Sequence, residues 1–201
     1  MIMGIRRKAP EVDAATIING FCERSLITKT STRVYPNIYL GRWEADILEL
    51  TKAGYLYEYE VKVSRKDFKI DAKKAEYWRG TNEVRSKKYD VLLKGERVHY
   101  FSYVVPEGLI DPEEVPEWAG LIYVRPYDNR VCIGFDKETG DPIFDEHVSA
   151  WFTTVKDPKK LRTEKVTPKE LEEIEKKVYF RYHQLRCKLI KQKLVTPFGI
   201  T

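Results

Sequence analysis

Cysteine is scarce in this chain of 201 residues, and the three that occur lie far apart. Cys22, Cys132 and Cys187 show no CxxC or Cys/His spacing, which argues against a zinc-binding motif and a disulfide framework. The sequence also has no signal-peptide pattern, no apolar run long enough to span a membrane and no internal repeat. These absences together predict a soluble protein of the reducing cytoplasm.

The charge balance is mildly basic. The chain has 36 lysines and arginines against 31 aspartates and glutamates, a net charge of +5. Hydrophobic residues make up 42% of it, which is enough for a core and argues against disorder. The length allows one large domain or one domain with an appendage. A weakly basic chain is compatible with a nucleic-acid partner but does not require one.

The most informative stretch runs from residue 43 to residue 64. It reads as two short strands joined by a turn in which Gly54 can adopt a positive φ. Because side chains on a strand alternate between its faces, the second strand has one apolar and one charged face. The charged face carries Glu58, Glu60, Lys62 and Ser64. If the hairpin pairs in register, Asp46 on the first strand comes near Glu60 and Lys62.

Two carboxylates beside a lysine have a chemical use. Carboxylate oxygens are the ligands that Mg²⁺ prefers, and Mn²⁺ suits similar sites. Such a cation polarises a phosphate and makes bound water more acidic, while a neighbouring lysine orients that water. A strand face of solvated charges would give the same sequence pattern, so the motif by itself leaves both interpretations open.

The order Asp46, thirteen intervening residues and then Glu60-Val61-Lys62 resembles the signature of the PD-(D/E)xK nuclease superfamily. The residues that follow are similar to its MmcB-like DNA-repair branch. The similar segments, in order, are Ser64-Arg65-Lys66-Asp67-Phe68, Asp71-Ala72-Lys73, Tyr77 and the stretch 100–108 that ends in Val-Pro-Glu-Gly. Two departures from the pattern are Ala45, where the superfamily has proline, and Lys74, where the branch has tryptophan.

The resemblance implies an α/β fold with a restriction-endonuclease-like mixed sheet flanked by helices. It also implies that Asp46 and Glu60 bind Mg²⁺, that Mn²⁺ substitutes for it, and that the Val61 carbonyl is a possible third ligand. Lys62 is implied to orient or activate the attacking water. The polar residues expected to support this site are Ser64 and Glu58.

A first helix is predicted over residues 11–25, where apolar residues recur at helical spacing. The superfamily often supplies one more acid from this helix, and the candidates are Glu11 and Glu23. A solvated acid on the helix surface is the simpler interpretation of either one.

Basic residues crowd the segment that follows the second strand, which is predicted to leave the sheet as a helix. Ammonium groups neutralise phosphates, and aromatic side chains stack on bases. A solvated helix face with core aromatics would explain any single residue equally well. The residues predicted to bind DNA are Arg65, Lys66, Lys69, Lys73, Lys74, Tyr77, Lys87 and Lys88.

The rest of the chain predicts elements around this centre. The predicted strands are an edge strand at 33–40, an interior strand at 98–105 and a further strand at 120–124. A hairpin is expected around residues 139–141. His99 has no second histidine nearby, so we expect a structural role for it. Trp151 and Phe152 are expected to be packing residues.

A capping box at residues 167–170 predicts a helix of about 26 residues that ends near Lys193. Its acids come first and its bases last, which suits the helix dipole and would equally place a basic end on DNA. The apolar stripe expected to pack consists of Leu171, Ile174, Val178, Leu185, Leu189 and Ile190.

The sequence therefore predicts a nuclease-like domain over residues 1–150 and a C-terminal linker and helical appendage over 151–201. The predicted function is metal-dependent hydrolysis of DNA, of a repair or recombination type. The alternative is a non-enzymatic DNA-binding module that keeps a degenerate nuclease fold. A third interpretation is a scaffold whose charged strand is solvated surface.

Overall fold

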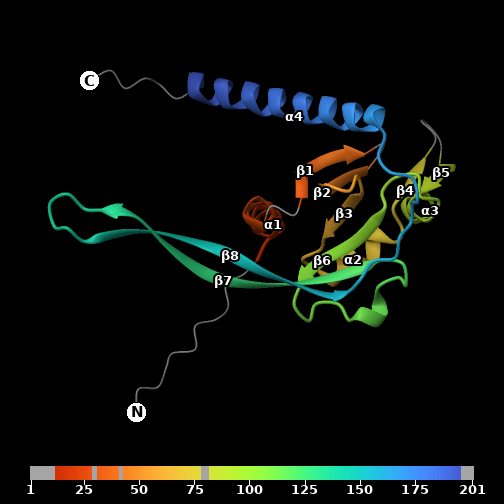
Figure 1. Cartoon of the computed structure of the whole chain (residues 1–201), viewed down its shortest axis with the longest axis horizontal. Helices are drawn as coiled ribbons and strands as arrows, with labels where there is room; N and C mark the ends of the chain where they lie inside the picture. Colours follow the sequence, from red (N-terminus) through yellow and green to blue (C-terminus); the bar gives the residue numbers. More distant parts are fainter. Residues whose placement is uncertain (1–11, 29–30, 41–42, 78–81, 196–201) are drawn as a thin grey trace, which may run out of the picture.

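The computed structural model describes residues 12–28, 31–40, 43–77 and 82–195. Six strands form a mixed sheet in the order β1-β2-β3-β6-β7-β8, with helices against both faces (Figure 1). These strands are β1 (Ser31–Leu40), β2 (Trp43–Thr51), β3 (Leu56–Val61), β6 (Tyr100–Pro106), β7 (Gly120–Phe135) and β8 (Pro142–Lys156). The helices are α1 (Ala14–Thr28), α2 (Arg65–Asp71), α3 (Lys88–Leu93), the 3₁₀ turn η1 (Pro112–Glu114) and α4 (Pro168–Val195). A small second sheet pairs β4 (Ala75–Tyr77) with β5 (Val84–Lys87). The predicted mixed α/β sheet flanked by helices is confirmed.

β2 and β3 form the central hairpin, as predicted. Gly54 in its turn has a φ of +81°, a conformation that glycine adopts without steric cost. The antiparallel register pairs Ile47 with Tyr59 and Leu48 with Glu58. Alternate side chains of β3 therefore point to opposite faces of the sheet.

Apolar residues cover both of these faces. On one face, Phe21 of α1 packs against Tyr59, with ring centroids 4.6 Å apart. On the other face, Phe68 of α2 and Leu92 of α3 join a core that includes Tyr103 of β6. The face of β3 that carries the charged residues is therefore covered by α2 and α3.

β6 is an interior strand, as predicted, and it runs parallel to both of its neighbours, β3 and β7. The chain between β3 and β6 crosses one face of the sheet and contains α2 and α3. A glycine is required where β7 begins, because a Cβ atom on Gly120 would lie 2.4 Å from Ser102 Oγ. The close approach of β6 and β7 thus depends on the missing side chain.

β7 and β8 are longer than predicted. Their pairing continues from the sheet out to Phe135 and Pro142. The two strands leave the core together as a twisted arm, whose closed end lies far from the other strands (Figure 1). The domain boundary expected at residue 150 falls inside β8, because this strand pairs with β7 on both sides of that position.

The two aromatic residues expected to pack near this boundary behave differently. Phe152 packs edge-on against Phe21 of α1. Trp151, on the opposite face of β8, is 64% exposed and stacks on Tyr127 of β7. The prediction for Trp151 was wrong because its side chain points away from the face of β8 on which Ala150 and Phe152 pack.

α4 begins with the predicted capping box. The Thr167 backbone N–H donates to the Glu170 carboxylate at 2.8 Å, and the Glu170 N–H donates to Thr167 Oγ1 at 3.2 Å. Ile174 is buried, and Leu171 and Val178 pack on the same core. The prediction that the stripe continues was wrong for Leu185, Leu189 and Ile190, which are exposed because this half of α4 extends past the sheet (Figure 1). No helix in the part of the chain that the structure describes is long and apolar enough to cross a membrane.

His99 has the structural role that was predicted. Its Nδ1 accepts a hydrogen bond from the Leu56 backbone N–H at 2.9 Å, and its Nε2 lies 2.6 Å from the Glu164 carbonyl oxygen. Nε2 therefore carries the proton. The ring ties the segment before α4 to the start of β3.

Candidate active site

Glu60 is the centre of a buried group of charges between the sheet and the helices α2 and α3. Its side chain is 2% exposed. The ammonium nitrogens of Lys62 and Lys74 lie 2.7 and 2.6 Å from Glu60 Oε1, and that of Lys88 lies 2.8 Å from Oε2. All three ammonium groups donate hydrogen bonds to this one carboxylate.

Three parts of the chain bring these lysines together. The Lys62 N–H donates to the Val104 carbonyl at 3.0 Å, which continues the β3–β6 pairing and keeps Lys62 on the same face as Glu60. Lys74 follows the end of α2, and Lys88 is the first residue of α3. The Lys88 N–H donates to the Lys74 carbonyl at 3.0 Å, so one backbone bond holds both segments at the site.

Asp71, on the buried face of α2, is a further member that sequence reasoning did not assign to the site. Its Oδ2 accepts a hydrogen bond from the Tyr103 hydroxyl at 2.9 Å. Its Oδ1 lies 2.7 Å from the Lys74 ammonium and 3.5 Å from those of Lys62 and Lys88. Asp71 therefore shares the three lysines with Glu60.

Asp46 approaches this group from β2. Its Oδ2 accepts a hydrogen bond from the Val61 backbone N–H at 2.8 Å. Burial raises the pKa of Asp46 to about 6, and the negative charge of Glu60 adds to the rise. The structure thus brings Asp46, Glu60 and Lys62 together, and their catalytic roles stay a prediction.

The lysines control the ionisation of Glu60. Burial acts to raise its pKa, but attraction to Lys88, Lys62 and Lys74 outweighs burial and holds the pKa well below its ordinary value. Burial acts to lower the pKa of Lys74, and the charges of Glu60 and Asp71 reverse this and raise it. Glu60 therefore stays a carboxylate, and Lys74 stays an ammonium, across the physiological pH range.

The interpretation of this strand face as solvated surface is wrong, because Glu58, Glu60 and Lys62 are all buried. Glu58 was expected to support the site directly. It is instead paired with Arg97, whose Nη2 donates to Glu58 Oε1 at 3.0 Å. Glu58 Oε1 also lies 3.8 Å from the Lys88 ammonium, so it connects Arg97 to the lysine group.

Half of the residues predicted to bind DNA are exposed and available to a phosphate: Lys66, Lys69, Lys73 and Lys87. Arg65 is exposed too, but its guanidinium is engaged. It donates to both oxygens of Glu114 at 2.6 Å and to the Leu109 carbonyl at 2.7 Å. The available lysines lie on α2, just after it, and at the end of β5.

The predicted DNA contact of Lys88 was wrong. Its side chain is fully buried, because its ammonium points into the charged group. Lys74 has a side chain that is 33% exposed, and its ammonium is directed at Glu60 and Asp71. Tyr77 lies in β4, and its side chain is outside the described residues.

The remaining predicted residues lie at or beyond the edge of the site. Ser64 caps α2, since its Oγ accepts the Asp67 N–H at 3.2 Å. This bond gives the hydroxyl a structural role at the start of the helix. Glu23 is exposed on α1, which packs on the opposite face of the sheet from Glu60. Glu11 lies outside the described residues.

Mg²⁺ is the cation that the resemblance implies. The described residues contain no group of three or more acidic, histidine or cysteine side chains arranged to hold a metal ion. The carboxylates of Asp46 and Glu60 are nevertheless the type of ligand that Mg²⁺ takes, since this cation keeps several waters and binds one or two carboxylates. A divalent charge beside the pair would relieve the repulsion that helps to raise the pKa of Asp46.

No family model and no curated protein matches this chain. Among solved structures, a protein of unknown function from Silicibacter pomeroyi, SPO1766, is similar. The TM-score is 0.51, and the match covers 95% of this chain and 100% of that chain at 14% sequence identity. An identity this low shows a shared fold and nothing about function.

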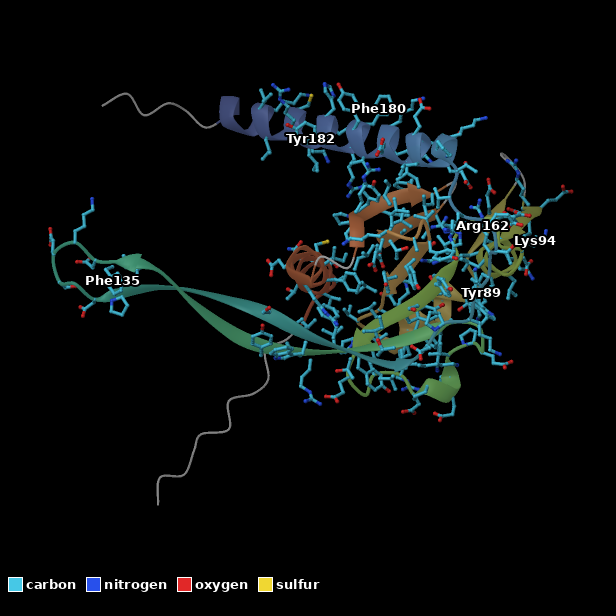
Figure 2. All side chains as sticks on the ribbon, in the orientation of Figure 1. Tyr89, Lys94, Phe135, Arg162, Phe180 and Tyr182 are labelled. Carbon is cyan, nitrogen blue, oxygen red and sulfur yellow. The ribbon has the colours of Figure 1, made fainter. Side chains whose placement is uncertain are left out.

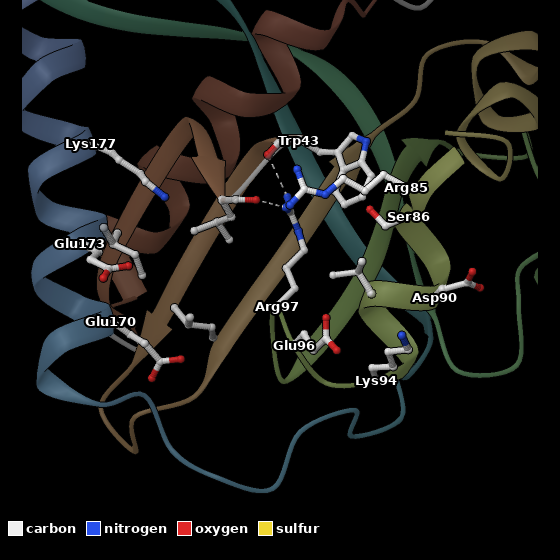
Figure 3. Close-up of a pocket in the computed structure, with 14 residues that line it drawn as sticks. Trp43, Arg85, Ser86, Asp90, Lys94, Glu96, Arg97, Glu170, Glu173 and Lys177 are labelled. Carbon is white, nitrogen blue, oxygen red and sulfur yellow. Dashed lines mark hydrogen bonds between the residues drawn. The ribbon is translucent and has the colours of Figure 1, made fainter. Parts of the chain in front are cut away.

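A cavity of about 570 Å³ lies next to Arg97, between α3 and α4 (Figure 3). Trp43 and Arg97 form part of its wall, and charged residues such as Lys94 and Glu173 surround them. Arg97 donates to the carbonyls of Leu40 and Trp43 as well as to Glu58. Its donors are therefore engaged by the protein, and the cavity has mixed charge.

Proposed function

We propose that this protein is a Mg²⁺-dependent DNA nuclease with a restriction-endonuclease-like core, acting in repair or recombination. One observation carries the proposal: Asp46 and Glu60 come together beside Lys62, which donates to Glu60 at 2.7 Å. Their order and spacing resemble the PD-(D/E)xK signature. The reducing cytoplasm, predicted from the sparse cysteines, is the compartment that we propose.

In this proposal Asp46 and Glu60 would hold the cation, with the Val61 carbonyl as a possible third ligand. The bound cation would polarise a phosphodiester and make water more acidic. The Lys62 ammonium orients the attacking water or stabilises the charge that develops on the phosphate. Its bond to Glu60 at 2.7 Å, beside the proposed metal ligands, supports this role.

Lys74 and Lys88 act through Glu60. They donate to its two oxygens and lower its pKa, so that it stays an anion at neutral pH. With Lys62, these lysines match the negative charges of Asp46, Glu60 and Asp71. A divalent cation would make the group positive, and a DNA phosphate would offset that charge.

DNA reaches the site from the side of α2. Lys66, Lys69 and Lys73 are exposed there, on the segment that leads from Lys62 to Lys74. Among the described contacts, none of these three lysines forms an ion pair. Each could therefore bind a phosphate without breaking one. This supports binding through the phosphate backbone of the DNA, which would recognise little of the base sequence.

A second candidate function is a DNA-binding module without catalysis. The observation that favours it is the three lysines around Glu60, which already neutralise the carboxylate without a metal. In that case the group acts as a structural ion cluster. The exposed lysines near α2 would still bind DNA, and cleavage would be absent.

Metal titration and DNA cleavage on two variants separate these functions. Lys62→Met removes the ammonium and should reduce cleavage by about 10² or more under saturating Mg²⁺, while calorimetry still detects metal binding. Asp46→Asn should weaken both metal binding and cleavage. Lys52→Met, an exposed residue in the β2–β3 turn outside the proposed DNA path, is the matched control. DNA binding without metal-dependent cleavage by the wild-type protein would leave the binding module as the function.

A further inference from the structure

The distal half of α4, residues 179–195, is joined to the sheet by the ion pair of Arg181 with Glu44, and beyond Arg181 its large apolar side chains are exposed. Phe180 and Tyr182 are 64% and 62% exposed on it and stand clear of the sheet (Figure 2). Leu185 and Leu189 are 50% and 58% exposed. Exposed apolar surface of this extent is typical of sites that contact another protein.

These residues follow a regular pattern. Val178, which packs on the core, is followed by Tyr182, Leu185 and Leu189 at spacings of four, three and four. This spacing places them on one side of the helix, in continuation of the stripe that holds α4 to the sheet. The stripe is therefore suited to pack against another protein surface.

The same half of α4 is strongly basic. Its sequence contains no aspartate or glutamate after Glu175. Its exposed basic residues beyond the Arg181–Glu44 ion pair are Arg186, Lys188 and Lys191. Two such helices would repel each other, so the surface that covers this stripe should be acidic.

The end of the β7–β8 arm has the complementary character. Its residues 134–143 include one lysine against three exposed acids, which are Asp136, Glu138 and Asp141. Phe135 is 68% exposed near the closed end of the arm (Figure 2), and Ile143 is 45% exposed. The chain thus carries an acidic apolar surface and a basic apolar surface.

We propose that a second copy of this chain covers the distal half of α4, with the arm of each protomer lying along α4 of the other. α4 and the arm project from the core in the same direction (Figure 1). A two-fold rotation would therefore bring each arm to the partner's helix and form both contacts at once. Such an arrangement is closed and produces a dimer.

The dimensions of the two elements agree. The last 17 residues of α4, 179–195, span about 25 Å at ~1.5 Å per residue. Residues 128–135 of β7, which lie beyond the core contact of Ala150, span about 26 Å at ~3.3 Å per residue. DNA, the other anionic occupant to consider, would use the basic residues but would leave Leu185 and Leu189 in water.

The test is the mass of the full-length protein by light scattering and sedimentation over a range of concentrations. The wild type should form a dimer. Leu185→Glu on the helix and Phe135→Ser on the arm should each weaken it by about tenfold or more, with unchanged thermal unfolding of the monomer. Lys52→Glu, an exposed residue in the β2–β3 turn, is the control and should leave the mass unchanged.

Charge reversal tests which surfaces meet. Lys188→Glu with Lys191→Glu should weaken the dimer, as should Glu138→Lys with Asp141→Lys on the arm. All four changes in one chain should restore it, because the attraction is re-formed with opposite signs. A monomeric wild type, or a four-fold variant that stays monomeric, would overturn the proposal. So would a Leu185→Glu variant that loses DNA affinity while its mass stays that of the wild type, since this half of α4 would then bind DNA.

Discussion

Replacing Asp46 with asparagine should stabilise the metal-free protein while impairing metal binding. The fold raises the pKa of Asp46 from 3.8 to about 6, chiefly through burial and then through the charge of Glu60. The difference of about 2.2 pKa units corresponds to about 3 kcal/mol of free energy that ionised Asp46 costs the folded state. Asparagine carries no charge and keeps an oxygen that can accept the Val61 N–H, so it should recover much of this free energy.

The gain should depend on pH in a defined direction. Because the folded pKa of Asp46 is raised, the cost of its ionisation is fully present above about pH 7 and is lost as the pH falls towards 3.8. The advantage of Asp46→Asn over the wild type should therefore be largest at pH 8. At pH 5 it should fall to roughly half of that value.

Thermal unfolding in the presence of EDTA measures this difference. For a chain of this size, each kcal/mol raises Tm by about 2–4 °C, so Asp46→Asn should melt up to about 10 °C above the wild type at pH 8. Asp157→Asn, an exposed aspartate, is the control and should change Tm little at either pH. If Asp46→Asn melts below the wild type at pH 8, or gains equally at pH 8 and pH 5, then Asp46 does not experience the buried, like-charged environment described above.

Two further predictions concern the lysines. Lys88→Met removes one of the three cations that hold Glu60, and it should lower the free energy of unfolding by about 3–5 kcal/mol in urea titrations. Lys87→Met, at the exposed neighbouring residue, should change this free energy by less than about 0.5 kcal/mol. Equal effects of the two substitutions would contradict the burial of Lys88. Lys73→Ala should leave unfolding unchanged and reduce the log–log salt slope of DNA binding by about 0.7–0.9, and an unchanged slope would place the DNA elsewhere.

The central hairpin could be predicted because its signals are local. Gly54 and the alternation along β3 fix the turn and the faces, and these faces place Asp46 beside Glu60. The inward direction of Lys88 and Asp71 could not be predicted in the same way. It depends on how α2 and α3 cross the sheet, and the sequence between residues 65 and 88 presents many basic residues of similar pattern.

The C-terminal helix shows a different limit. The apolar stripe from Leu171 to Leu189 is continuous in sequence, so periodicity treats all of it as core-facing. Only the tertiary structure sets where the supporting sheet ends, which is beyond Val178. The length of β7 was missed for a similar reason, because charged residues in the arm interrupt the apolar pattern that marks a strand in a core.

The strand order also determines which strand edges remain unpaired while the chain is being synthesised. β1, β2 and β3 are consecutive in sequence and in the sheet, so they can pair while the ribosome is still translating. β6, the other neighbour of β3, begins only at Tyr100. Until then β3 has an open edge, the kind of surface on which nascent chains aggregate. Glu58 and Glu60 place two charges on that edge, and we expect them to keep it from joining other strands until β6 arrives.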